Sequence, residues 1–142
     1  MEDEWIKLNW DAPGLVKKIL VDWQPIEFAS ERAAEDSLYE YLHAQFEKTQ
    51  VTRQYARGRA TVDLVIGERV MIELKHNLST TSELQRLKGQ LMEYKSWDMA
   101  IMVVLTGETD MNLLKDLKMF VQRELSGAFL LDDPVEVIQK GT

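Results

Sequence analysis

Apolar and polar residues alternate along two neighbouring segments in the middle of the chain, residues 60–66 and 70–76. A period of two predicts a pair of half-buried strands, here joined by a short glycine-containing loop at 67–69. A further strand is expected over 50–57, and the uninterrupted apolar run at 99–107 predicts a strand buried on both faces. The chain therefore has the strands needed for one central sheet.

Apolar positions three and four residues apart predict helices on both sides of these strands. The first helix follows Pro13 and covers 14–23, while residues 1–12 are expected to form an arm or a short edge element. The second helix begins after Ser30, a good N-cap residue. Its apolar stripe consists of Ala34, Leu38, Leu42 and Phe46.

Two more helices are predicted after the strand pair. The third covers 83–97, with Ser82 and Gln85 at the spacing of a capping box. The fourth is capped by Asp110 and is expected to end at Ser126-Gly127. The residues expected on the buried side of the third helix are Leu84, Leu87, Leu91 and Tyr94.

The order of these elements predicts an α/β fold with a mixed central β-sheet flanked by helices. One or two short terminal strands are expected around Pro134. The length favours a single domain over 1–142, with a core at about 30–107. A helical arm at 1–26 and a C-terminal helix with short strands at 110–140 complete it.

The loop at 67–69 decides which side chains share a face. A three-residue loop, unlike a two-residue turn, separates apolar from charged side chains on the two strands. In that register Asp63 lies opposite Glu73, and Lys75 lies two residues further along on the same face. Two carboxylates so close repel each other unless a cation lies between them, and hard oxygen ligands suit Mg²⁺ or Mn²⁺. A solvent-facing strand pair with a Glu–Lys salt bridge is the simpler alternative.

The charge distribution modifies the picture of an acidic protein. The net charge of −7 taken alone argues against nucleic acid, but residues 48–97 hold 9 basic and 5 acidic side chains between two acidic flanks. Within this segment, 48–62 has four cations and no anion. The stretch is therefore either a solvated strand and turn or a surface that faces phosphates.

Several classes of protein are excluded or disfavoured. The absence of cysteine excludes disulfides, thiolate metal sites and thiol catalysis. No apolar run approaches the length of a membrane span, and the acidic start lacks the layout of a signal peptide. We therefore expect a cytoplasmic protein with no membrane partner.

The hairpin residues match a known family. Asp63 on one strand, followed by Glu73-Leu74-Lys75 on the next, resembles the motif of the PD-(D/E)XK nuclease superfamily, whose fold is restriction-endonuclease-like. The order of elements over about 30–107 follows that family too, with a helix before the strands and a helix and a buried strand after the motif.

A second motif lies on the third predicted helix. Gln90 and Tyr94 are four residues apart and resemble the Q-x-x-x-Y of the RecB-like and Cas4-like branch. The chain departs from the family at Val62, where the motif's name has proline, and it lacks the cysteines of the iron–sulfur members. Read without the family, Gln90 is a helix surface residue and Tyr94 a half-buried core residue.

The resemblance implies metal-dependent hydrolysis of DNA phosphodiester bonds, with Mg²⁺ as cofactor and Mn²⁺ able to replace it. It implies that Asp63 and Glu73, with the carbonyl of Leu74, hold the metal. Lys75 would orient the attacking water and offset charge on the phosphate. Nearby carboxylates favour its ammonium form, so we prefer this role to that of a base.

Family members often add a glutamate from the preceding helix. Of Glu31, Glu35 and Glu40 we favour Glu35, because it flanks the buried stripe and can reach the sheet; its alternative role is to interact with the helix dipole. Glu31 lies one turn earlier on the same side, and Glu40 is expected to face water. The residues expected to contact DNA phosphates are Arg53, Arg57, Arg59, Arg86 and Lys88.

Two other functions remain open at this point. A catalytically silent module that binds nucleic acid or protein in a regulatory role is the alternative, although an intact set of Asp63, Glu73 and Lys75 argues against it. An acidic nucleic-acid mimic is disfavoured by the basic middle of the chain. A symmetric homodimer is a possible assembly for cutting both strands, with the N-terminal arm as its contact.

Overall fold

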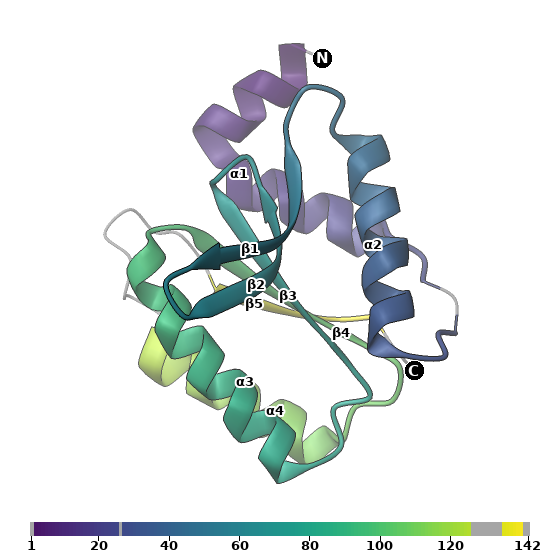
Figure 1. Ribbon diagram of the computed structural model, residues 1–142, viewed down its shortest axis with the longest axis vertical. Helices are drawn as coiled ribbons and strands as arrows, with labels where there is room; N and C mark the ends of the chain where they lie inside the picture. The colour runs from purple at the N-terminus through teal and green to yellow at the C-terminus, as the bar shows by residue number, and fades with distance from the viewer. Residues whose placement is uncertain (1, 26, 126–134, 141–142) are drawn as a thin grey trace.

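The structure, a computed structural model, describes residues 2–25, 27–125 and 135–140, with the backbone alone for 2–10 (Figure 1). Five strands form one sheet in the order β1-β2-β3-β4-β5, antiparallel from β1 to β3 and parallel from β3 to β5. The strands are β1 (Val51–Arg57), β2 (Ala60–Ile66), β3 (Val70–His76), β4 (Ala100–Thr106) and β5 (Val135–Gln139).

Helices cover both faces of this sheet (Figure 1). One apolar core lies under α1 and α2, and a second lies under α3 and α4. The predicted mixed sheet flanked by helices is thus confirmed, and it is consistent with a restriction-endonuclease-like fold. None of the described helices is long and apolar enough to cross a membrane. The helices are α1 (Glu2–Asp22), α2 (Glu31–Gln45), α3 (Thr81–Tyr94) and α4 (Met111–Phe120), with short turns η1 (Lys95–Trp97) and η2 (Val121–Leu125).

The N-terminal segment is helical, so an edge element at 1–12 is wrong. Helix α1 starts at Glu2 and kinks at Asp11, whose φ of −151° is not helical. The Asp11 carboxylate accepts a hydrogen bond from the Gly14 N–H at 3.1 Å and so caps the second segment of the helix. Pro13 fits in this new first turn because a backbone N–H there has no helical partner.

The predicted start of α2 is confirmed, and that of α3 is wrong. Ser30 caps α2, and the predicted stripe of this helix is buried. For α3 the capping box is Thr80 with Glu83, not Ser82 with Gln85, and the helix begins at Thr81. Both pairs have the required spacing, but Glu83 supplies a charged acceptor that bonds the backbone N–H of Thr80 at 3.1 Å.

The C-terminal predictions are confirmed where the chain is described. Strand β4 is buried along its whole length, and Asp110 caps α4 by accepting from the N–H groups of the next turn. Strand β5 is one short strand of the kind expected after Pro134, and the residues before it, 126–134, lie outside the described part of the chain. The expected helix end at Ser126-Gly127 lies outside the described residues.

The predicted register of the β2–β3 hairpin is confirmed. Leu64 pairs with Ile72, and the three-residue loop 67–69 joins the strands. Gly67 in this loop has a φ of 56°, a left-handed conformation that favours glycine. Leu64 and Ile72 consequently face the core under α1 and α2 together.

Candidate active site

The backbone ladder between β2 and β3 stops at the Leu64–Ile72 pair, one residue short of Asp63 and Glu73. Beyond this point, side chains take the place of backbone partners. The Leu74 N–H donates to Asp63 Oδ2 at 2.8 Å, and the Asp63 N–H donates to Glu73 Oε1 at 3.3 Å. The structure thus brings the two predicted carboxylates together, each bonded to the backbone of the opposite strand.

The β1–β2 hairpin changes faces at the same level. In β2, Leu64 packs under α1 and α2, whereas Val62, two residues away, packs under α3 and α4. Opposite Asp63 in β1, Gln54 has a left-handed φ of 50° and interrupts the ladder. Asp63 therefore lies where the hairpin passes from one layer to the other, within reach of side chains from both.

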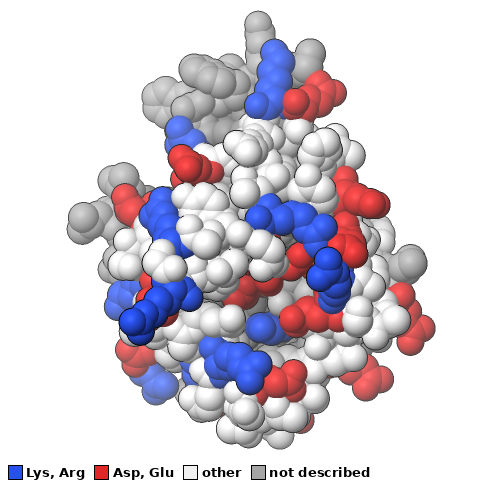
Figure 2. All heavy atoms as spheres, viewed as in Figure 1, with Lys and Arg blue, Asp and Glu red and all other residues white. Residues whose placement is uncertain are grey.

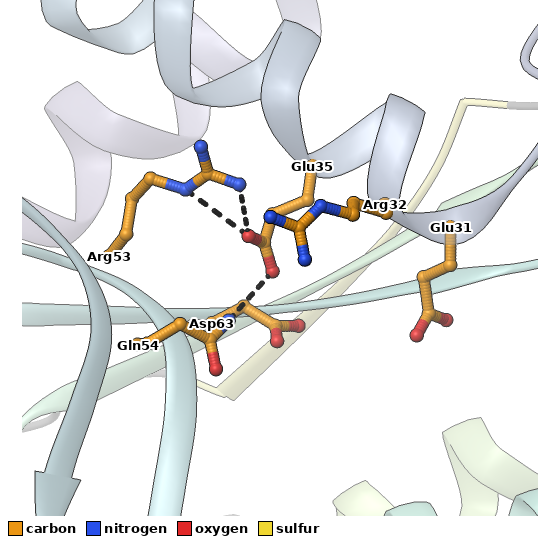
Figure 3. Close-up of a pocket in the computed structure, with 6 residues that line it drawn as sticks. All are labelled: Glu31, Arg32, Glu35, Arg53, Gln54 and Asp63. Carbon is orange, nitrogen blue, oxygen red and sulfur yellow. Dashed lines mark hydrogen bonds and ion pairs between the residues drawn. The ribbon is translucent and has the colours of Figure 1, made fainter.

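A pocket of about 450 Å³ opens beside Asp63 on the α2 side (Figure 3). Glu35 reaches into it from α2, accepts from Gln54 Nε2 at 2.9 Å and pairs with Arg53. Burial raises the pKa of Glu35, as does the Asp63 carboxylate, while Arg53 opposes them. The residues that line the pocket are Glu31, Arg32, Glu35, Arg53, Gln54 and Asp63.

Glu73 lies on the other side of Asp63 and is 1% exposed. The Tyr94 hydroxyl from α3 lies 2.9 Å from Glu73 Oε2 and 2.8 Å from the Thr61 carbonyl oxygen. Tyr94 has one hydrogen to donate to these two oxygens, and a protonated Glu73 can supply a second one for its own contact with the hydroxyl. Burial, with Asp63 adding to it, raises the pKa of Glu73 to about 9, which keeps the carboxyl neutral at pH 7.

Lys75 and the open edge of β3 complete the site. Lys75 is partly exposed, forms no ion pair within the described part of the chain, and favours the ionised form of Glu73. The Leu74 N–H faces β2, and its carbonyl points the same way because both groups of a strand residue lie on one side. Further along, the His76 N–H donates to Glu31 Oε1 at 3.1 Å.

These donors suit a hard divalent cation in chemistry, although they do not form a closed cage. No group of three or more His, Cys, Asp or Glu side chains stands around a common point within the described residues. Mg²⁺ usually takes one or two carboxylates and completes its shell with water and phosphate. Asp63 and Glu73 fit that need, provided that Glu73 gives up its proton.

Gln90 and Tyr94 have different environments on α3. Tyr94 is fully buried and bonds to Glu73 as described above. Gln90, one turn earlier on the same side, has a buried Oε1 atom with no hydrogen-bond partner among the described residues. This structure therefore connects Tyr94 to the carboxylates, while Gln90 has no partner in the part of the chain that it describes.

Three of the five basic residues expected at phosphates make contacts within the protein. Arg53 pairs with carboxylates of α2, Arg57 stacks on two aromatic rings, and Lys88 pairs with α4 at 3.0 Å. Arg59 and Arg86 are exposed, and neither forms an ion pair with another described residue. The internal partners are Glu35 and Asp36 for Arg53, Tyr55 and Trp97 for Arg57, and Asp116 for Lys88.

Two pocket residues, Arg32 and Gln54, were not expected from the sequence. Arg32 lies three residues before Glu35 on α2, a spacing that places both on one side of the helix and could have signalled it. Gln54 gives no such signal, since nothing in its neighbours predicts a left-handed residue inside a strand.

Figure 2 shows acidic atoms in a hollow between the β1–β2 hairpin, α2 and α3, with basic side chains around it.

Comparison with known proteins leaves the family open. No protein-family model matches the sequence, and no curated protein matches it. Among solved structures, SfsA of Pyrococcus furiosus in complex with Ca²⁺ matches with a TM-score of 0.45 at 15% identity, over 78% of this chain and 55% of that one. A likeness of this strength supports no conclusion, so the function has to be inferred from the geometry of the chain itself.

Proposed function

We propose that this protein is a metal-dependent nuclease that hydrolyses DNA phosphodiester bonds, with Mg²⁺ as its cofactor and Mn²⁺ as a substitute. The observation that carries the proposal is the contact between Asp63 and Glu73 where the β2–β3 ladder stops, with Lys75 beside them. Burying one carboxyl against another is unfavourable for folding. A solvated strand pair would not require two carboxyl groups so close together, whereas a metal site does.

The residues of the chain have distinct roles in this proposal. A bound metal would lower the pKa of its water and stabilise charge on the phosphate. Asp63 and Glu73 would hold it, and Glu73 would have to give up its proton to do so. Tyr94 then donates to the Glu73 carboxylate and fixes its orientation, while the Lys75 ammonium positions the water and offsets negative charge.

Glu35 and the open cations extend the site toward the substrate. Glu35 interacts with Asp63 from the pocket side, where its carboxylate would accept a hydrogen bond from a water in the pocket. Arg59 and Arg86, which are exposed, remain the phosphate contacts of choice from the predicted set. A homodimer stays a prediction for cleavage of both strands.

The test is cleavage of linear, circular and branched DNA in Mg²⁺, Mn²⁺ or EDTA. We expect cleavage in either metal, none in EDTA, and a fall of about 10²–10⁴-fold for Lys75→Ala. Lys115→Ala is the matched control, because Lys115 is exposed on α4 and carries the same charge. RNA of the same sequence serves as a second substrate and tests the choice of DNA.

A catalytically silent module is the second candidate, and one observation favours it. Asp63 and Glu31 accept hydrogen bonds from the open edge of β3, a purely structural role that needs no metal. Calorimetry with millimolar Mn²⁺ decides between the two candidates. If the wild type binds no Mn²⁺, or if Asp63→Asn binds it equally well, the nuclease proposal fails and the silent module stands.

A further inference from the structure

The pocket beside Asp63 contains two guanidinium groups in different situations. Arg53 is paired with Glu35 and Asp36 and lies 5.2 Å above the ring of Tyr39. Arg32 is exposed and makes no hydrogen bond or ion pair with the rest of the described chain. The pocket thus has one cation that positions a carboxylate and one that is open to a ligand.

Arg32 lies near the carboxylates without neutralising them. Arg32 and Glu35 are three residues apart on α2 and line the same pocket. Figure 3 shows the Arg32 guanidinium extending from α2 across the pocket, on the side where Glu35 and Asp63 lie. A ligand bound at Asp63 would therefore lie within the reach of this side chain.

The charges of the pocket indicate what that ligand is. Three carboxylates and two guanidinium groups give the lining a formal charge of −1. A divalent cation at Asp63 changes the charge to +1, which one phosphodiester group neutralises. The planar guanidinium fork matches two phosphate oxygens, so an unpaired arginine here favours a phosphate over other anions.

We propose that Arg32 binds the substrate phosphate that lies over Asp63, and that it does so in place of Arg53, which the sequence suggested. The proposal rests on the proposed nuclease function, since it assigns a substrate contact to that same site. Arg53 is instead a positioning residue that holds Glu35 in the pocket. The phosphate contact thus comes from α2, across the pocket from the β1 cations.

The experiment compares Arg32→Ala, Arg32→Lys and the control Arg123→Ala, whose side chain is exposed on η2 away from the pocket. Cleavage is measured in Mg²⁺, and binding of a fluorescent oligonucleotide is measured in Ca²⁺ over a range of salt. We expect kcat/KM to fall about 10- to 100-fold for Arg32→Ala, with partial recovery in Arg32→Lys. The slope of log Kd against log salt should fall by about one.

The outcomes separate this inference from the function on which it rests. If the wild type cleaves DNA and Arg32→Ala stays within twofold of Arg123→Ala, Arg32 has no such role and the nuclease function stands. If the wild type binds but does not cleave, and Arg32→Ala weakens binding, the phosphate contact stands and the nuclease function fails. If the wild type neither binds nor cleaves, both are wrong. Circular dichroism confirms that each variant is folded.

Discussion

Strand β3 has two halves that differ in their neighbours. Its first half, Val70–Ile72, pairs with β2 on one side and β4 on the other and is apolar and buried. Its second half, Glu73–His76, pairs only with β4, and its open edge is covered by side chains of Asp63 and Glu31. The same strand thus contributes to the core at one end and to the candidate site at the other.

The difference shows how a carboxylate site arises from a sheet. Where β2 turns away, the N–H groups of Leu74 and His76 lose their backbone partners and must be satisfied otherwise. Carboxylates meet that need, and Asp63 and Glu31 both do so. Their negative charge then gathers at the opening, where a cation and a phosphate can offset it.

The largest effect should come from Asp63→Asn in the open half. The amide oxygen can still accept from the Leu74 N–H, so the strands stay in place, but the charge that holds a metal is lost. We expect cleavage to fall about 10²–10⁴-fold with little change in melting temperature. Glu124→Gln is the control, because Glu124 is exposed on η2. Equal activity in Asp63→Asn and the wild type would mean that Asp63 is not part of the active site.

The two halves should also respond differently in stability. Ile72→Ala leaves a cavity in the core under α1 and α2 and should lower the free energy of unfolding by about 2–5 kcal/mol. Lys75→Ala, in the open half, should change it by less than about 0.5 kcal/mol while it removes activity. Urea denaturation measures both. A loss in Lys75→Ala as large as that in Ile72→Ala would make Lys75 a structural residue.

The paired half of β3 was predictable from the sequence, because the alternation of side chains admits one register. The same parity predicted that Asp63 and Glu73 lie next to each other, and they meet one residue beyond the last backbone pair. That Glu35 reaches the sheet was predictable for a similar reason, since its place beside the apolar stripe fixes the direction in which it points. The same reasoning does not separate it from Glu31, which lies one turn earlier and lines the same pocket.

The open half was not predictable to the same degree. The change of face at Gln54 depends on one backbone angle, and no local pattern signals it. Which arginines face solvent depends on partners distant in the chain, such as the α2 carboxylates that pair with Arg53. The sequence also did not decide between Thr80 and Ser82 as the N-cap of α3, because Thr80 with Glu83 and Ser82 with Gln85 both have the spacing of a capping box.

The buried carboxyl predicts an unusual pH dependence. The pKa of Glu73 is raised from 4.5 to about 9, so between these values the unfolded chain loses a proton that the folded chain keeps. Stability in EDTA should therefore fall as the pH rises through this window, by at most about 1.4 kcal/mol per pH unit. Thermal melts from pH 5 to 9 measure it, and Glu73→Gln should flatten the curve.

Metal should reverse this trend if Asp63 and Glu73 bind it. Binding requires the ionised Glu73, so the stabilisation by Mn²⁺ should increase with pH in the wild type and be lost in Glu73→Gln. A wild type whose stability in EDTA does not fall with pH relative to Glu73→Gln would mean that the Glu73 carboxyl is already ionised in the folded chain across this window.

The smallest effect concerns Gln54, where the β1–β2 hairpin changes faces. A left-handed φ costs a non-glycine residue about 1 kcal/mol, and Gln54→Gly relieves this strain. The same change removes the hydrogen bond to Glu35 and adds conformational freedom to the unfolded chain. Thr52→Gly, two residues earlier in β1 at a position without a positive φ, has no strain to relieve. Comparing each glycine variant with the alanine variant at the same position cancels the loss of the side chain and of its hydrogen bond. Relative to alanine, glycine should therefore cost about 1 kcal/mol less at position 54 than at position 52 in urea denaturation. Equal costs would mean that the left-handed residue carries no strain, and that the face change which places Asp63 between the two layers is set by the side chains around it.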